Sequence, residues 1–126
     1  MAHLEAAVAL WRGDFLAGVE MGDWAMYRRE ALRQAFLDGV LRLAELRFAA
    51  ARYAVAADAF RQALALDSYL ELAHRGLMRC FARQGEGSLA VRHFLNLQRL
   101  LHTDLRAVPS PETTLLYDRI RRGDNI

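Results

Sequence analysis

The feature that most constrains the fold of this chain is an internal repeat of 34 residues. When the sequence is shifted against itself by 34 positions, apolar or small residues coincide at several landmarks. A period of this length is typical of a helix–turn–helix unit that buries its apolar face by stacking on a neighbouring unit. The matched pairs are Leu43 with Leu77, Ala44 with Met78, Ala51 with Gly85, Ala56 with Ala90, Phe60 with Phe94 and Ala63 with Leu97.

The matched residue types suit helices that pack closely. Small residues such as Ala44, Ala56 and Ala90 suit places where two helices approach closely, and the large Phe60 and Phe94 would fill the space beside them. The period is that of the tetratricopeptide repeat, so we expect repeat units at about 37–70 and 71–104. The sequence therefore predicts an all-α, tetratricopeptide-like fold, a right-handed α–α superhelix of about six to seven helices, in one domain over residues 1–126.

The composition agrees with a helical, water-soluble domain. The chain has 22 alanines, 21 leucines and 17 arginines, which all favour helices, and only two prolines. Cys80 is the only cysteine, which excludes a disulfide scaffold. No apolar run approaches the roughly 18 residues of a membrane-spanning helix. The first residues also lack the pattern of a signal peptide. We expect a cytoplasmic protein with no membrane contact.

Capping signals predict where the later helices begin. Ser68 with Glu71 three residues later is a capping-box pattern, which would open a helix running to about Gln84. After a turn at 85–87, Ser88 would cap a helix running to about His102. The pair Ser110–Pro111 would open a C-terminal capping helix at about 111–122. Upstream we expect a long helix at about 24–50 capped by Asp23, a first helix at about 3–11 and a short one near 15–19.

Aromatic side chains at helical spacing are expected in the core. This expectation covers Trp24, Tyr27, Phe48, Phe60, Phe81 and Phe94. We assign no binding role to any of them.

The sequence predicts no catalytic, metal or cofactor site, and we expect a protein that is not an enzyme. The histidines His3, His74, His93 and His102 show no i,i+4 ligand spacing, and His74, which falls where the period puts Val40, is expected to be half-buried or exposed. Cys80 lies in a strongly helical stretch and is expected in the core. The serines stand at expected helix starts, where capping explains them, and a phosphate-binding loop would need a lysine that the chain lacks.

The candidate binding residues are Arg75, Arg79 and Arg83. Their i, i+4, i+8 spacing places them on one face of the first helix of the second repeat unit. In tetratricopeptide units this helix lines the concave surface, so the three arginines are candidate contacts for an acidic partner. Alternatively they form a solvated face that pairs with carboxylates of the preceding unit. Glu45 lies one period before Arg79, and Asp38 shares the side of the helix that carries Glu45.

The charge balance does not favour nucleic acid as the partner. The net charge is only +2 at a pI of about 9.1, although every permanently positive side chain is an arginine. Arginine suits bidentate contacts with phosphate. We favour the other interpretation, in which a biased base composition of the genome accounts for the many arginines. We therefore expect little nonspecific nucleic-acid binding at physiological ionic strength.

Two flanking motifs resemble those of the bacterial transcriptional activator domain. The stretch LWRGDFLAG at Leu10–Gly18 is similar to a motif near the start of that family. The stretch PSPET at Pro109–Thr113, followed by Leu116, Tyr117 and Ile120, is similar to the family's terminal signature. The long helix and the two repeats follow in the family's order. Arg106 departs from the pattern, because it stands where the family usually has glycine.

The resemblance implies a role in transcription regulation through protein contacts. The implied partners are RNA polymerase, another regulator domain or a second copy of the chain as a homodimer. Family members generally carry a winged-helix DNA-binding domain ahead of this module, and the residues before His3 could not encode one. Sequence-specific DNA binding is therefore not expected of this chain alone. The alternative is an oligomerisation or signalling domain with no direct transcription contact.

Overall fold

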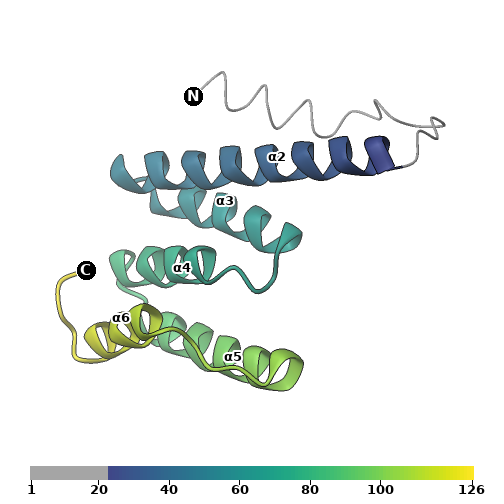
Figure 1. Ribbon diagram of the computed structural model, residues 1–126. Coiled ribbons are helices and arrows are strands. Elements are labelled where there is room, and N and C mark those ends of the chain that lie inside the picture. Colours follow the sequence, from purple (N-terminus) through teal and green to yellow (C-terminus); the bar gives the residue numbers. More distant parts are fainter. Residues whose placement is uncertain (1–22) are drawn as a thin grey trace.

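The computed structural model describes residues 23–126, and within that range the chain forms α-helices and no strand (Figure 1). The all-α class predicted from the sequence is confirmed. The described helices are α2 (Asp23–Ala49), α3 (Tyr53–Leu66), α4 (Glu71–Arg83), α5 (Gly87–Leu105) and α6 (Pro111–Arg121). These are fewer than the six to seven expected. The helices expected at 3–11 and 15–19, and the motif at Leu10–Gly18, lie outside the described residues.

Each helix packs against the next one along the chain, which gives a layered stack (Figure 1). In addition, α4 contacts both α2 and α6. The helices α2, α4 and α6 therefore follow one another along one side of the stack. This side carries the groove described below.

Helix ends recur at the 34-residue interval. Helix α2 ends at Ala49 and α4 at Arg83, whereas α3 begins at Tyr53 and α5 at Gly87. The turns between them also match, because Ala51 and Gly85 both take positive φ angles, of 59° and 76°. The other five landmark pairs are buried in both members: Leu43 and Leu77, Ala44 and Met78, Ala56 and Ala90, Phe60 and Phe94, Ala63 and Leu97. The pairs α2–α3 and α4–α5 thus repeat one local geometry.

Large buried aromatic residues of α3 and α5 pack between the layers. Phe60 is fully buried and lies so close to Gly76 of α4 that a Cβ there would be 2.3 Å from its ring. Phe94 of α5 stacks on Tyr117 of α6, with ring centroids 4.1 Å apart. Cys80 is buried as predicted. The fold therefore depends on close helix contacts that only small residues on α4 permit.

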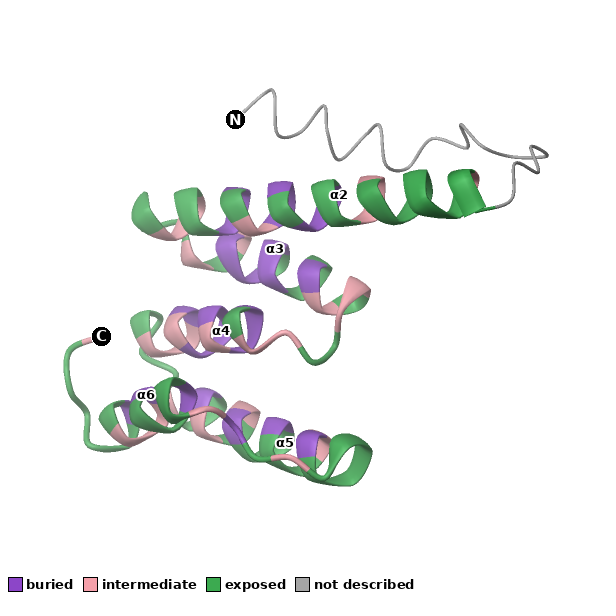
Figure 2. Ribbon diagram, viewed as in Figure 1, coloured by how far each residue is buried: buried purple, intermediate pink, exposed green. Residues whose placement is uncertain are grey.

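The prediction that all six aromatic residues lie in the core is wrong for two of them. Phe48 and Phe81 are partly buried against the core, but Trp24 and Tyr27 are 52% and 78% exposed. Both lie in the first turns of α2, which extend past the end of α3 (Figure 2). Helical spacing identifies one face of α2, but among the described helices α3 covers only the later part of that face.

Of the three predicted serine caps, one is confirmed and two are wrong. The Ser110 hydroxyl accepts a hydrogen bond from the backbone N–H of Thr113 at 3.4 Å, and Pro111 opens α6. Ser68 does not cap α4, since that helix begins at Glu71 after Leu70 with no side-chain cap. The reason is that Glu71 is hydrogen-bonded to the start of α6 instead.

The other incorrect cap and the departure from the family pattern both concern α5. This helix begins at Gly87, so Ser88 lies within its first turn and does not cap it. The helix runs to Leu105, beyond the predicted end at His102. Arg106 ends it in the left-handed conformation, with φ at 50°. The turn geometry that favours glycine is therefore kept although an arginine occupies the position.

Candidate functional site

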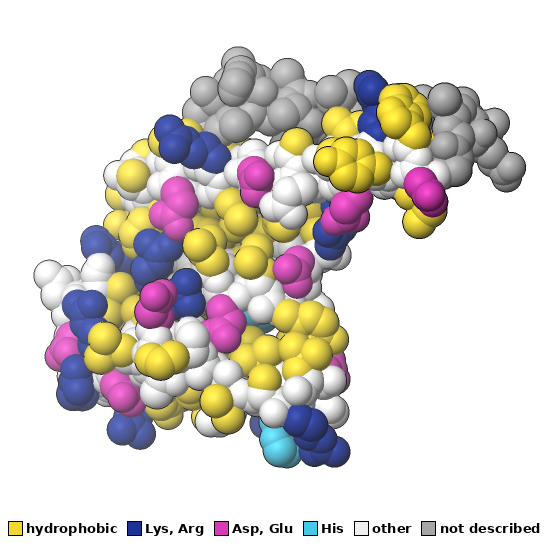
Figure 3. All heavy atoms as spheres, in the orientation of Figure 1, with side chains coloured by type: hydrophobic (Ala, Val, Ile, Leu, Met, Phe, Trp, Pro, Cys, Tyr) yellow, Lys and Arg dark blue, Asp and Glu magenta, His cyan; other side chains and the backbone are white. Residues whose placement is uncertain are grey.

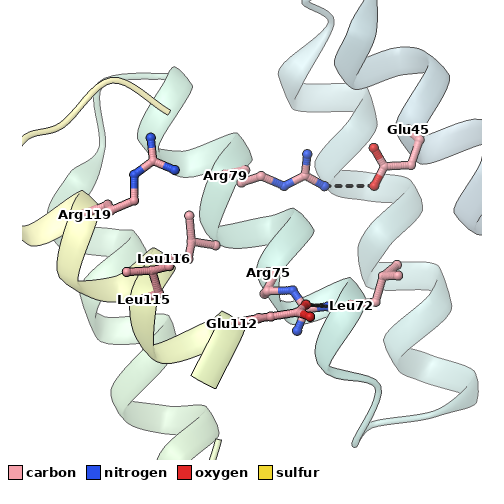
Figure 4. A pocket seen from close by; sticks show the side chains of 8 residues that line it. All are labelled: Glu45, Leu72, Arg75, Arg79, Glu112, Leu115, Leu116 and Arg119. Atoms are coloured by element: carbon pink, nitrogen blue, oxygen red, sulfur yellow. Dashed lines mark hydrogen bonds and ion pairs between the residues drawn. The ribbon is translucent and has the colours of Figure 1, made fainter. Parts of the chain in front are cut away.

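A groove lies on the side of the stack formed by α2, α4 and α6 (Figure 4). Its volume is about 350 Å³. It is lined by Glu45 of α2, by Leu72, Arg75 and Arg79 of α4, and by Glu112, Leu115, Leu116 and Arg119 of α6. Two of the three arginines predicted to bind a partner thus share one concave surface.

Arg79 is held in the groove by two contacts. Its guanidinium forms a 2.8 Å ion pair with Glu45, which confirms the pairing expected between residues one period apart (Figure 4). The same guanidinium lies over the Phe48 ring, 4.6 Å from the centroid. Asp38, the other carboxylate considered, accepts a hydrogen bond from Gln34 instead. Aromatic and carboxylate contacts together fix the Arg79 side chain.

Arg75 joins α4 to the first turn of α6. Its Nη1 donates to the Thr113 hydroxyl at 3.0 Å, and its Nη2 lies 3.3 Å from the Glu112 carboxylate. The Arg75 side chain is mostly buried, whereas that of Glu112 is 79% exposed. The ion pair with Glu112 is therefore close to solvent, and the bond to Thr113 is not.

Glu71 is the centre of a hydrogen-bond network beneath Arg75. Its carboxylate accepts from the Thr113 hydroxyl at 2.6 Å and from the Ser110 backbone N–H at 2.9 Å. Burial raises the pKa of Glu71, but the hydrogen bonds from Thr113 and Ser110 and the charge of Arg75 outweigh it, so that the pKa lies below its usual value. The network stabilises the ionised carboxylate and fixes α6 to α4.

Arg83 takes no part in lining the groove. Its Nε and Nη2 donate to the backbone carbonyl of Ile126 at 3.1 and 2.6 Å, and its Nη1 lies 3.4 Å from the Tyr53 hydroxyl. The structure therefore divides the predicted stripe. Arg75 and Arg79 line the groove, and Arg83 contacts the end of the described chain.

Exposed apolar side chains flank the charged residues of the groove. Leu72 of α4 is 42% exposed and Leu115 of α6 is 59% exposed, while Leu116, next to Leu115, is buried. Figure 3 shows hydrophobic side chains beside arginine and acidic side chains over this part of the molecule. The sequence analysis missed both leucines. The signal for Leu72 was its place one turn before Arg75 on the same helix, whereas the repeat gave no signal for Leu115.

The model of the bacterial transcriptional activator domain family matches residues 1–121 of the chain. The chain belongs to this family. Comparisons with curated proteins and with solved structures gave no match. The match shows a domain of transcription regulators, as the two flanking motifs led us to expect.

The terminal signature of this activator domain has a structural role. Ser110 caps α6 through its hydroxyl and binds Glu71 through its backbone N–H. Thr113, fully buried, connects Glu71 to Arg75. Ile120 is buried in the core between α4 and α6. The signature therefore places α6 beside α4, so that residues of both helices line the groove.

A pair of histidines, with His74 buried and His93 half-buried, was missed by the sequence analysis. His74 Nδ1 lies 2.8 Å from His93 Nε2, and His74 Nε2 lies 2.8 Å from the backbone carbonyl of Ser68. Because a carbonyl can only accept, neutral His74 carries its proton on Nε2, and His93 donates to its Nδ1. The signal was the period itself, since His74 and His93 fall one period after the buried residues Val40 and Ala59. His74 is thus buried, and the expectation that it is half-buried or exposed is wrong.

The environment of these groups favours their neutral forms. Burial lowers the pKa of His93 to about 4, with further contributions from His74 and Arg61, and also lowers the pKa of His74. Burial raises the pKa of the Cys80 thiol to about 11. Within residues 23–126, no three His, Cys, Asp or Glu side chains converge as metal ligands would. None of the described helices is both long and apolar enough to cross a bilayer.

Proposed function

We propose that this activator domain recognises a protein partner through the groove between α2, α4 and α6. In this proposal the fold is a tetratricopeptide-like right-handed superhelix, with repeat units at 37–70 and 71–104 and a capping helix at 111–122. The partner is RNA polymerase or another domain of a transcription regulator. Binding a partner there would couple the module to transcription.

The observation that carries this proposal is the pair of exposed leucines beside the arginines. Leu72 and Leu115 lie on opposite helices of the groove and are both substantially exposed. Protein interfaces derive most of their affinity from a few anchors surrounded by polar groups. Exposed apolar side chains next to fixed charged groups have this arrangement.

The arginines supply the polar part of the proposed interface. Arg75 and Arg79 line the groove and are held by contacts within the chain, so that their guanidiniums need little ordering when a partner binds. Arg83 lies on the same helix outside the groove and is proposed as a contact at the edge of this face. In the alternative, all three arginines form contacts only within the chain. Replacing them would then leave the binding of partners unchanged.

The proposal assigns no catalytic role, no cofactor and no metal, and it places the protein in the cytoplasm. It includes no sequence-specific DNA binding by this chain alone and no membrane contact. Regulation of transcription would follow from protein contacts.

The second candidate function is homo-oligomerisation through the same groove. The opposite charges on its lining favour this alternative, because Arg119 and Glu112 of one copy could pair with Glu112 and Arg119 of another. Light scattering over a dilution series separates the two. A dimer that persists on dilution and is lost with Leu115→Glu supports self-association.

The test of the proposed function is retention of RNA polymerase holoenzyme, or of a regulator's DNA-binding domain, on the immobilised chain. Leu115→Glu places a charge in the groove, and Leu95→Glu places one on an exposed position of α5. We expect retention by the unmodified chain and by Leu95→Glu, and loss with Leu115→Glu. Equal retention by both variants would contradict the role of the groove.

A further inference from the structure

We propose that the groove binds an amphipathic segment that carries a carboxylate next to a large apolar side chain. The carboxylate of the partner replaces Glu112 at Arg75, and the apolar side chain packs against Leu115 beside it. This inference rests on the proposed function and names the chemistry of the partner.

The two ion pairs of the groove differ in how easily they can be exchanged. Glu45 holds Arg79 at 2.8 Å, and Phe48 packs on the same guanidinium. Glu112, in contrast, is 79% exposed and lies 3.3 Å from Arg75. Exposed ion pairs contribute little free energy, because water and salt screen them. Glu112 is therefore the carboxylate that an incoming one can replace.

Arg75 stays oriented when Glu112 leaves. Its Nη1 donates to the Thr113 hydroxyl, and that hydroxyl donates to Glu71. The bond to Thr113 is independent of Glu112 and lies in the buried part of the site. Arg75 thus offers Nη2 to a ligand from a fixed position, and fixed donors bind carboxylates without a further ordering cost.

The charge of the lining favours an acidic partner. Three arginines and two glutamates line the groove, so the lining carries one excess positive charge. The Nη2 of the third arginine, Arg119, donates to the backbone carbonyl of Asn125 at 2.7 Å. A partner carboxylate at Arg75 neutralises this excess charge, whereas a lysine would meet Arg75 and Arg119 as a like charge.

The apolar part of the groove fits side chains of about leucine size. The buried Leu116 adjoins the exposed Leu115 on one side of the Arg75–Glu112 pair, and Leu72 lies on the other side (Figure 4). The groove has a volume of about 350 Å³. Pockets that hold compact ligands begin at roughly 300 Å³. An amphipathic helix that places a leucine and a glutamate three or four positions apart presents both groups on one face.

The test uses fluorescence anisotropy with the whole chain and three labelled peptides. The probe peptide carries leucine and glutamate at helical spacing, and two matched peptides carry glutamine or lysine in place of each glutamate. We expect the glutamate peptide to bind at least about tenfold more tightly than the lysine peptide, and the glutamine peptide to fall between them. Equal binding of the glutamate and glutamine peptides would overturn the carboxylate site.

Variants of the chain sharpen the test. Glu112→Gln removes the internal competitor, so the glutamate peptide should bind about two- to fivefold more tightly. Arg119→Glu should weaken binding of the glutamate peptide about tenfold. Arg99→Glu, at an exposed position of α5, makes the same charge change outside the groove and should leave binding unchanged. Circular dichroism verifies that each variant folds. Unchanged or weaker binding by a folded Glu112→Gln variant would overturn the exchange at Arg75.

Failure of this inference is distinguishable from failure of the proposed function. If Leu115→Glu abolishes retention of the protein partner while all three peptides bind equally or not at all, the groove remains the interface and the carboxylate site is overturned. If Leu115→Glu affects neither retention nor peptide binding, both proposals fail.

Discussion

Removing the Glu71 carboxylate should release α6 from α4. In Glu71→Ala the Ser110 N–H loses its acceptor, and the buried Thr113 hydroxyl loses the partner 2.6 Å away. Hydrogen bonds to charged groups contribute about 1.5–3 kcal/mol each, and neighbouring ones are not additive, so we expect a loss of about 2–4 kcal/mol in the free energy of unfolding. Urea denaturation followed by circular dichroism measures it.

A double-mutant cycle with Thr113→Val isolates the central bond. Valine keeps the shape of threonine and removes the hydroxyl, so the single variant should lose about 1.5–3 kcal/mol. Combined with Glu71→Ala, the loss should fall short of the sum by about 1–2 kcal/mol, because both variants remove the same bond. Strict additivity, or a loss below about 0.5 kcal/mol for Glu71→Ala, would refute the role of this network in fixing α6.

The contribution of this network to the free energy of unfolding should also depend on pH. The pKa of Glu71 is lower in the folded chain than in the unfolded chain, so the unfolded state binds the proton more readily. The stability from this group is therefore fully present above the unfolded pKa and declines as the pH falls through the folded pKa. Glu71→Ala should lose less stability than the unmodified chain between pH 5 and pH 3 (roughly the range in which a carboxyl titrates).

Three further predictions concern single positions. Because burial lowers the pKa of His93 to about 4, the unfolded chain binds the proton first as the pH falls. The free energy of unfolding should therefore drop by about 1–2 kcal/mol from pH 7 to pH 5, after allowance for screening. His93→Gln should reduce this dependence on pH in urea titrations. Gly76→Ala gains about 1 kcal/mol of helix propensity but places a Cβ 2.3 Å from the fully buried Phe60 ring. Thermal unfolding should therefore show a net loss of about 1–2 kcal/mol in the free energy of unfolding. A more stable variant would contradict the close packing. Arg106→Gly removes the strain of an arginine in the left-handed conformation, at φ 50°, and should stabilise the chain by about 0.5–1 kcal/mol in the same assay. A destabilised variant would show that the arginine side chain contributes more free energy than the backbone strain costs.

The fold could be predicted largely from the sequence because the repeat relates positions that are far apart. Glu45 and Arg79 are one period apart and form an ion pair, and Ala51 and Gly85 share a turn geometry. A period fixes the register of stacked units, and register determines which side chains face each other. Contacts that follow from register were therefore within reach of sequence reasoning.

Features that depend on contacts between residues far apart in the sequence, and unrelated by the repeat, could not be predicted from the sequence. Ser68 and Glu71 match a local capping pattern, but the partners of Glu71 are 39 and 42 residues away on α6. The exposure of Trp24 depends on where α3 ends, which the spacing within α2 does not encode. The groove was predicted only through its arginines. Its apolar part includes Leu115 on α6, a helix that the period does not relate to α4.

The central claim is that the groove between α2, α4 and α6 contacts the protein partner. Methyl NMR of the leucine-labelled chain, titrated with RNA polymerase holoenzyme or a regulator's DNA-binding domain, tests it directly. We expect the signals of Leu72, Leu115 and Leu116 to shift or broaden first, while those of Leu95 and Leu105 on α5 remain. Perturbation confined to the α5 leucines, or no perturbation at any leucine, would contradict the account.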